Sequence, residues 1–233
     1  MVLLGLNRLH LHLTDDQGWR IDVPGWPRLR EIASVRVASQ TTLEPTSTDG
    51  RPHGGCYTDD ELRGLVAYAE ARGVIVVPEI DMPGHMTAAI AAYPHLGNVD
   101  VSGRHQVSTR WGVHDTVLNL SDAAIAFCRD VLEHVLSIFP APWIDVGGDE
   151  CPTDEWVASP AARKRLADLG IARQSEAQQW WTSQLVTWLL ERGRTPIVWD
   201  EAASDNLSRD VLVMAWRSTE HAIDAARRCC GRS

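Results

Sequence analysis

The sequence predicts an α/β fold, because strand-like apolar runs alternate with segments of helical spacing. This alternation is typical of parallel strands joined by right-handed crossovers, as in an open doubly wound sheet or a (β/α)8 TIM barrel. Two further observations favour the barrel. No glycine-rich phosphate loop follows a predicted strand, and polar residues follow several strands, as an active site at the carboxyl end of a barrel requires.

The predicted strands are short, and each is bounded by turn or helix signals. They cover residues 6–13, 74–80, 143–146, 195–199 and 211–216. A closed barrel of this class has eight parallel strands. With five predicted strands in 233 residues, we expect a single domain, 1–233, that contains an incomplete barrel.

Helical segments fill the intervals between these strands. Thr58 and Glu61 form a T-x-x-E capping box before an apolar stripe, and Gly73 supplies the stop. A second helix is expected from residues 121–122 to just before 140, a third opens at 159–160, and a fourth covers about 174–192.

The composition restricts the class of partner. The chain has 31 Asp and Glu against 22 Lys and Arg, a formal net charge of −9, and no basic cluster. Nucleic acid and anionic membrane surfaces are therefore not expected as partners. A neutral ligand fits this charge better. Ten Trp against two Phe is an unusual ratio, and indole faces can pack against sugar C–H surfaces or cations, although most of these Trp residues are expected in the core.

The sequence shows no signal for a disulfide framework, a cofactor site or a targeting segment. The five cysteines are scattered and indicate neither a disulfide framework nor a zinc knuckle, and no cofactor is expected. The opening residues, MVLLGLNRLHLHL, fit neither a signal peptide nor a membrane span. Cellular location and oligomeric state stay open.

The motif DVGGDE, residues 145–150, places two adjacent acids, Asp149 and Glu150, after two glycines. Neighbours in a regular strand point to opposite faces, so both acids can face one substrate only if the glycines release the backbone from strand geometry. Adjacent carboxylates are poorly arranged to act as a nucleophile and an acid on opposite sides of a sugar. They suit substrate assistance, in which the substrate's own amide attacks. The alternative is that both are solvated loop residues or helix caps.

Four motifs in order resemble the catalytic barrel of glycoside hydrolase family 20, the β-N-acetylhexosaminidases. They are LNRLHLHLTDDQGWRIDVPGWPRL, VVPEIDMPGH, GGDE and VWDEA. The resemblance implies that about strands 2 to 6 of the barrel are present. It also implies retaining, substrate-assisted hydrolysis of terminal N-acetylglucosamine or N-acetylgalactosamine, with Glu150 as general acid and Asp149 orienting the acetamido group.

The resemblance assigns supporting roles to five further residues. It places Asp15, Asp81 and His85 in the polar network around the acid, and Trp199 and Trp216 in the walls of the sugar pocket. Each assignment has an alternative. The two aspartates are residue types that commonly form turns. The histidine can make a supporting hydrogen bond only, and the two indoles can belong to the barrel core. Asp200 and Glu201 are left without a role.

The chain also departs from the family pattern. Asp145 stands where the family motif has His, and a third carboxylate there is expected to raise the pKa values of its acidic neighbours. Met1 lies just before the expected second strand, and the chain stops after the expected sixth. We therefore expect a barrel truncated at both ends, with a non-folding or inactive remnant as one alternative. A metal-dependent hydrolase is another, since His10-x-His12 is typical of paired metal ligands, although we expect no metal.

Overall fold

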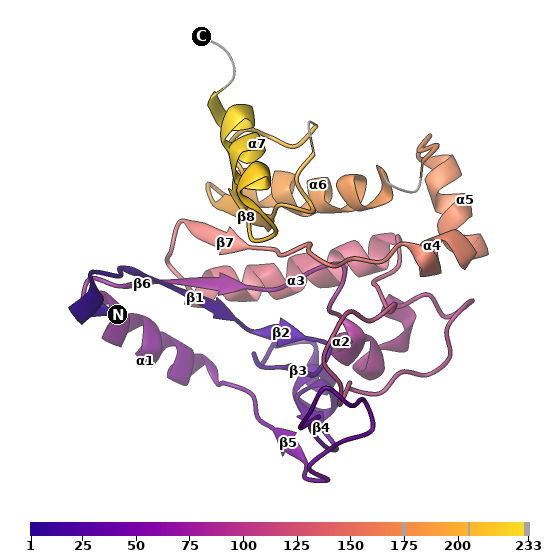
Figure 1. Ribbon diagram of the computed structural model, residues 1–233, viewed down its shortest axis with the longest axis horizontal. Coiled ribbons are helices and arrows are strands. Elements are labelled where there is room, and N and C mark those ends of the chain that lie inside the picture. The colour runs from indigo at the N-terminus through magenta and orange to yellow at the C-terminus, as the bar shows by residue number, and fades with distance from the viewer. Residues whose placement is uncertain (174–175, 205, 231–233) are drawn as a thin grey trace.

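The computed structural model describes residues 1–173, 176–204 and 206–230. Its main sheet has five parallel strands in the order β1 (Arg8–His12), β6 (Ile75–Glu79), β7 (Trp143–Asp145), β8 (Thr195–Trp199) and β9 (Leu212–Met214). Helices lie in the connections from β1 to β6, from β6 to β7 and from β7 to β8 (Figure 1), whereas no helix is described between β8 and β9. The predicted incomplete α/β barrel is confirmed, although the first and last strands are shorter than the predicted 6–13 and 211–216.

The register of the strands places several polar side chains at one level of the sheet. His12 at the end of β1 pairs with Glu79 at the end of β6, and Glu79 in turn pairs with Asp145 at the end of β7. Asp145 is opposite Ile197 of β8. Three neighbouring strands therefore end together, and the loops that follow them share one edge of the sheet.

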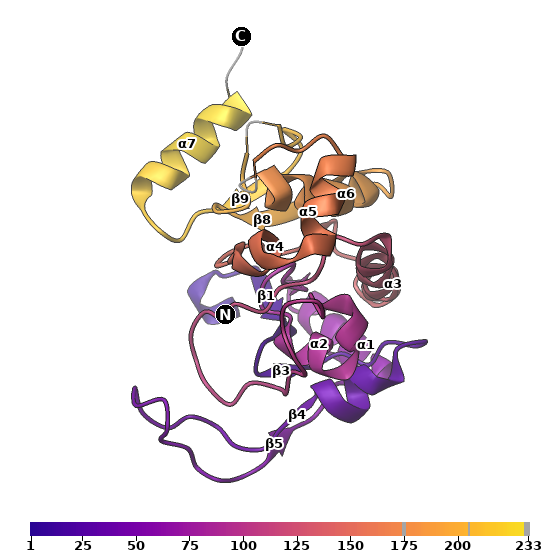
Figure 2. The same cartoon turned by 90° about the vertical axis from the view of Figure 1, so that its right-hand side faces the viewer.

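The four predicted helices are present. Helix α1 (Asp59–Glu70) begins at the predicted capping box, and α3 (Asp122–Ile138) is capped by Ser121. Helix α5 (Pro160–Asp168) has Pro160 in its first turn, and α6 (Ala177–Leu190) precedes β8. The predicted start of this last helix at Gln174 lies outside the described residues. Helices α1, α3 and α6 lie on one side of the strands (Figure 2).

The structure adds elements that the sequence analysis did not predict, and all of them except the 12-residue helix α7 are short. A two-residue strand offers no periodicity to detect, and a single helical turn offers little more. These elements are η1 (Val2–Leu4), β2 (Thr14–Asp15), β3 (Gly18–Trp19), η2 (Leu29–Ala33), β4 (Val35–Arg36), β5 (His53–Gly54), α2 (Thr87–Ala92), η3 (Pro94–Leu96), α4 (Asp154–Ala158) and α7 (Thr219–Cys230). The antiparallel pair β2–β3 matters most for function, because it carries Asp15 directly after β1.

The core lies between the sheet and its helices. Leu62 of α1, Leu132 of α3 and Leu185 of α6 are completely buried. Their burial removes apolar surface from water, which is the main force that holds helices against a sheet. None of the described helices has the length and apolar character needed to cross a membrane.

Candidate active site

The turn that follows β7 presents the two adjacent acids. Gly147 and Gly148 adopt φ values of 67° and 96°, so the backbone leaves strand geometry as the sequence predicted. A Cβ on Gly147 would lie 1.8 Å from Oδ1 of Asp81, which excludes any other residue there. The side chains of Asp149 and Glu150 are 19% and 32% exposed and lie within reach of the same imidazole.

His85 is the centre of the first group of titratable residues, which we call the mouth cluster. Its Nδ1 lies 3.0 Å from Oδ1 of Asp15 and 3.4 Å from Oδ2 of Asp16. Its Nε2 lies within 4.0 Å of three further carboxylates, those of Asp81, Asp149 and Glu150. The structure thus brings together Asp15, Asp81, His85, Asp149 and Glu150, all of which were predicted from sequence.

Charge balance in the mouth cluster keeps His85 protonated. Burial alone would lower the pKa of His85, but hydrogen bonds to Asp15 and Asp16 overcome this effect and raise that pKa to about 12. Burial would raise the pKa of Asp15, but hydrogen bonds to His12 and His85 hold it well below its usual range. Burial, followed by the charge of Asp149, raises the pKa of Asp81. An imidazolium therefore faces both acids of the turn.

A second group, the strand cluster, lies on the strands themselves and consists of His10, His12, Glu79 and Asp145. Oε2 of Glu79 is 2.8 Å from Nε2 of His10 and 2.5 Å from Nδ1 of His12. Burial alone would lower the pKa of His12, but hydrogen bonds to Asp15 and Glu79 raise it to about 10. Burial, followed by the charge of Glu79, raises the pKa of Asp145.

The two predicted indoles differ in their surroundings. Nε1 of Trp199 donates a hydrogen bond of 2.8 Å to Oε1 of Glu79, and its ring packs against His10 with 5.8 Å between centroids. Trp199 is therefore tied to the strand cluster. Trp216 follows β9 and is 52% exposed, and its backbone N–H donates to Oδ1 of Asp200. Its place in a sugar pocket stays a prediction.

Comparison with known proteins identifies the family. The model of the glycosyl hydrolase family 20 catalytic domain matches residues 1–230. The chain belongs to this family. A β-hexosaminidase of Porphyromonas gingivalis is 37% identical over 227 residues, which cover 97% of this chain and 28% of that protein. A β-hexosaminidase of Akkermansia muciniphila is also 37% identical, over 93% of this chain and 43% of that protein.

Solved structures support the same family 20 assignment. The exo-β-N-acetylglucosaminidase of Vibrio harveyi in complex with N-acetylglucosamine superposes with a TM-score of 0.83 at 33% identity, over 98% of this chain and 36% of that chain. A crystal structure of a β-N-acetylhexosaminidase superposes with a TM-score of 0.79 at 37% identity, over 88% of this chain and 42% of that one. The chain thus spans less than half the length of these relatives.

Three residues of this family 20 site were missed by the sequence analysis. Asp16 is completely buried, and its Oδ1 accepts the backbone N–H of Thr87 at 2.9 Å. Glu79 joins two histidines and an indole, and Glu201 accepts a backbone N–H from Glu150. A sequence signal was available for Glu79. It lies two residues before Asp81, and residues i and i+2 of a strand share a face, so Glu79 could have been predicted on the same face as Asp81.

Among the residues that the structure describes, three sets of side chains have ligand atoms close enough to hold a metal ion. Within each set the atoms lie within 4.8 Å of one another. Two sets draw on the mouth cluster, where the carboxylates already face His85. The third comprises His10, Glu79 and Asp145, and here Oδ2 of Asp145 is buried without a hydrogen-bond partner among the described residues. The two mouth-cluster sets also contain such atoms, Oδ2 of Asp16 and Oδ1 of Asp149, so this feature does not rank the three sets.

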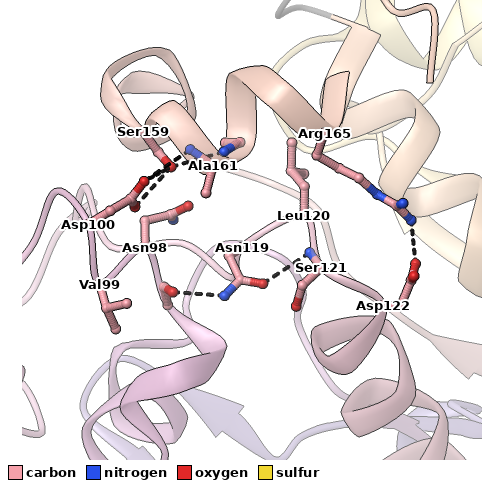
Figure 3. Close-up of a pocket in the computed structure, with 12 residues that line it drawn as sticks. Asn98, Val99, Asp100, Asn119, Leu120, Ser121, Asp122, Ser159, Ala161 and Arg165 are labelled. Carbon is pink, nitrogen blue, oxygen red and sulfur yellow. Dashed lines mark hydrogen bonds and ion pairs between the residues drawn. The ribbon is translucent and has the colours of Figure 1, made fainter. Parts of the chain in front are cut away.

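A separate pocket of about 350 Å³ lies between the loop after η3, the start of α3 and helix α5 (Figure 3). Four of its polar side chains form two pairs. Asp100 accepts hydrogen bonds from Ser159, and Arg165 forms an ion pair with Asp122 (Figure 3). The residues that line it include none of those predicted for catalysis, so we do not place the reaction there.

Proposed function

We propose that this family 20 domain hydrolyses terminal non-reducing N-acetylhexosamine residues with retention of configuration. One observation carries the proposal: Asp149 and Glu150 are consecutive residues at the carboxyl end of the sheet and both face His85. This arrangement suits a reaction in which the acetamido group of the substrate, rather than a protein carboxylate, attacks the anomeric carbon. The names of the relatives, which are β-hexosaminidases, support the same substrate class.

In the first step Glu150 donates its proton to the glycosidic oxygen as the bond to the anomeric carbon breaks. The carbonyl oxygen of the acetamido group attacks the same carbon and forms a cyclic oxazolinium ion. A water molecule then attacks the anomeric carbon, and Glu150 accepts its proton, which returns the enzyme to its starting state. Two inversions at one carbon give net retention.

Asp149 orients the acetamido group and balances the charge of the oxazolinium ion. Among the described residues, no hydrogen-bond donor reaches the buried Oδ1 of Asp149. This oxygen is free to accept the N–H of the substrate amide, and the ionised carboxylate stabilises a neighbouring cation. Nε2 of His85 lies 4.0 Å from the other oxygen of Asp149.

The surrounding side chains fit a sugar ligand. Trp199 is fixed by its hydrogen bond to Glu79 and its packing against His10, so its ring face is preorganised. A fixed indole offers a flat apolar surface to the C–H groups of a pyranose. Asp15 and Asp81 hold His85 from two sides, which keeps the imidazolium beside the acids.

The direct test is turnover of a chromogenic N-acetylglucosaminide and of the matching N-acetylgalactosaminide. We expect both to be hydrolysed with retention and a plain aryl glucoside to be inert, because it lacks the attacking amide. Rapid hydrolysis of the glucoside would contradict substrate assistance. The chain should be assayed beside a version extended at both ends, since it spans only part of its relatives.

A metal-dependent hydrolase is the second candidate, and the set of His10, Glu79 and Asp145 favours it. Nitrogen and carboxylate oxygen ligands suit zinc and similar ions. Metal analysis of the purified protein distinguishes the two functions. Stoichiometric metal, lost together with activity on chelation, would favour this candidate, whereas full activity in a chelator supports the substrate-assisted reaction.

A further inference from the structure

The catalytic turn holds one residue in a backbone conformation that its side chain does not favour. Gly147 and Gly148 have positive φ values, which glycine adopts without strain. Glu150 also has a positive φ, 44°, and for a residue with a Cβ this left-handed conformation is unfavourable. The surrounding structure must therefore hold Glu150 in place.

Glu201 makes the contact that opposes this strain. Its Oε2 accepts the backbone N–H of Glu150 at 2.7 Å. Its Oε1 lies 3.7 Å from Nε of Arg217, and the side chain is only 19% exposed. A hydrogen bond from N–H to a carboxylate is stronger than one to a neutral acceptor, so this contact is suited to fixing a strained backbone.

The neighbouring N–H groups of the turn are held in the same way. Gly147 donates to Oδ1 of Asp145, and Gly148 donates to Oδ1 of Asp81, each at 2.8 Å. The three acceptors follow or end the adjacent strands β6, β7 and β8. Asp81 and Asp145 accept hydrogen bonds from glycine N–H groups, whereas Glu201 accepts one from Glu150, which has a side chain.

We propose that Glu201 is a positioning residue for the general acid, an inference that rests on the proposed function. The φ angle of Glu150 sets the direction of its Cα–Cβ bond and so decides whether its carboxyl group reaches the glycosidic oxygen. Glu201 acts through the backbone of Glu150, because one of its oxygens accepts that N–H and the other faces Arg217. Loss of the acceptor allows Glu150 to relax to negative φ and withdraws the acid from the leaving group.

The adjacent Asp200 has a different task. Its Oδ2 accepts a 2.7 Å hydrogen bond from Nε of Arg217, and its Oδ1 accepts the backbone N–H of Trp216. Asp200 therefore ties the loop after β8 to the segment after β9. Of these two consecutive acids, it is Glu201 that contacts the catalytic turn.

The test compares Glu201→Ala with Glu201→Gln in an active form of the protein. Gln keeps a carbonyl oxygen that can accept the N–H of Glu150. We expect Glu201→Ala to lose ~10²-fold in kcat on a substrate with a poor leaving group, since a misplacement of ~1 Å costs about this much. On an activated aryl substrate the loss should stay below ~10-fold, with KM little changed, because that leaving group needs little protonation. Glu201→Gln should recover most of the loss.

The matched control is Glu133→Ala, which removes a 63% exposed carboxylate of helix α3 that pairs only with Arg192 among the described residues. Its kcat should be unchanged on both substrates. Equal losses for the two leaving groups in Glu201→Ala, or a Gln variant as impaired as Ala, would overturn the proposal.

A crystal structure of Glu201→Ala tests the same inference without any turnover. We expect Glu150 to move to negative φ, whereas an unchanged φ would overturn the positioning role. This measurement separates the inference from the proposed function, which fails instead if the unsubstituted protein, also in its extended form, does not cleave N-acetylhexosaminides.

Discussion

The mouth cluster and the strand cluster are both built from histidines and carboxylates, yet they reach different groups. In the mouth cluster, Nε2 of His85 faces Asp149 and Glu150, the two acids of the turn after β7. In the strand cluster, Glu79 joins His10 and His12 and accepts the indole N–H of Trp199. Asp149 and Glu79 differ in what remains free: Asp149 keeps a buried oxygen available to a ligand, whereas both oxygens of Glu79 are engaged. The unpartnered oxygen of Asp145 in the strand cluster lies 3.4 Å from Nε2 of His10.

This comparison distinguishes carboxylates that can take part in the reaction from carboxylates that only support the fold of the site. A carboxylate with a free oxygen can bind substrate, and a carboxylate whose oxygens already accept hydrogen bonds can only hold its partners. We therefore expect substitutions in the mouth cluster to lower activity more than stability. Substitutions in the strand cluster should do the reverse, and the following predictions test this contrast from the largest effect to the smallest.

The largest effect is expected for Glu150→Gln, because the amide cannot act as a general acid toward the leaving oxygen. The loss on substrates with poor leaving groups should be ~10²–10⁴-fold in kcat, the usual contribution of general acid catalysis. An activated aryl substrate should lose less. Steady-state kinetics on both substrates checks this, and equal losses would remove Glu150 from the acid role.

Asp149→Asn should come next, with a loss of ~10²–10³-fold in kcat, comparable to removing one preorganised electrostatic partner. An amide cannot balance the positive charge of an oxazolinium ion as a carboxylate does. The loss should be similar for good and poor leaving groups, since cyclisation is affected in both. A variant that loses activity only on poor leaving groups would show that Asp149 belongs with the acid instead.

His85→Gln should lower kcat by ~10–100-fold, because contacts of charged groups contribute ~1.5–3 kcal/mol and each 1.4 kcal/mol is tenfold in rate. His12→Gln in the strand cluster should lower kcat by less than ~10-fold. Kinetics and thermal melts of both variants test the contrast. A larger loss of kcat in His12→Gln than in His85→Gln would contradict the proposed difference between the two clusters.

The stability of the strand cluster should depend on pH through His12. Its pKa rises from 6.5 in the unfolded chain to about 10 in the fold. The stabilisation is therefore complete below pH 6.5 and is lost as the pH rises from 6.5 to 10. Between pH 6.5 and 10, the unfolding midpoint of His12→Gln should fall less steeply than that of the unsubstituted protein, as denaturant titrations would show. Parallel slopes would mean that His12 is not charged in the fold.

The smallest effect is expected for Asp145→Asn, because the amide oxygen can still accept the N–H of Gly147. The amide accepts this hydrogen bond less strongly than a carboxylate, but removing a buried charge next to Glu79 offsets that loss. The free energy of unfolding should therefore shift by less than ~1 kcal/mol. Asp145→Ala leaves that N–H buried without a partner and should cost ~1–3 kcal/mol. Chemical denaturation of the two variants measures the difference, and equal costs would show that the hydrogen bond contributes nothing.

Much of this fold and site was predictable from local signals. The capping box at Thr58 and Glu61 located the start of α1, and the apolar runs located all five strands of the main sheet. The two glycines before Asp149 indicated that the backbone turns there, and the positive φ values of Gly147 and Gly148 confirm it. Such signals are readable because capping and periodicity depend on residues only a few positions apart.

Only the tertiary structure decided which groups pair. Glu201 accepts the N–H of Glu150 across 51 positions of sequence, and Trp199 donates to Glu79 across 120. Sequence left Glu201 without a role and passed over Glu79, because a carboxylate on a loop or strand end has no local pattern that names its partner. The register of adjacent parallel strands brings these side chains to one edge of the sheet, and that register is set by packing over the whole chain.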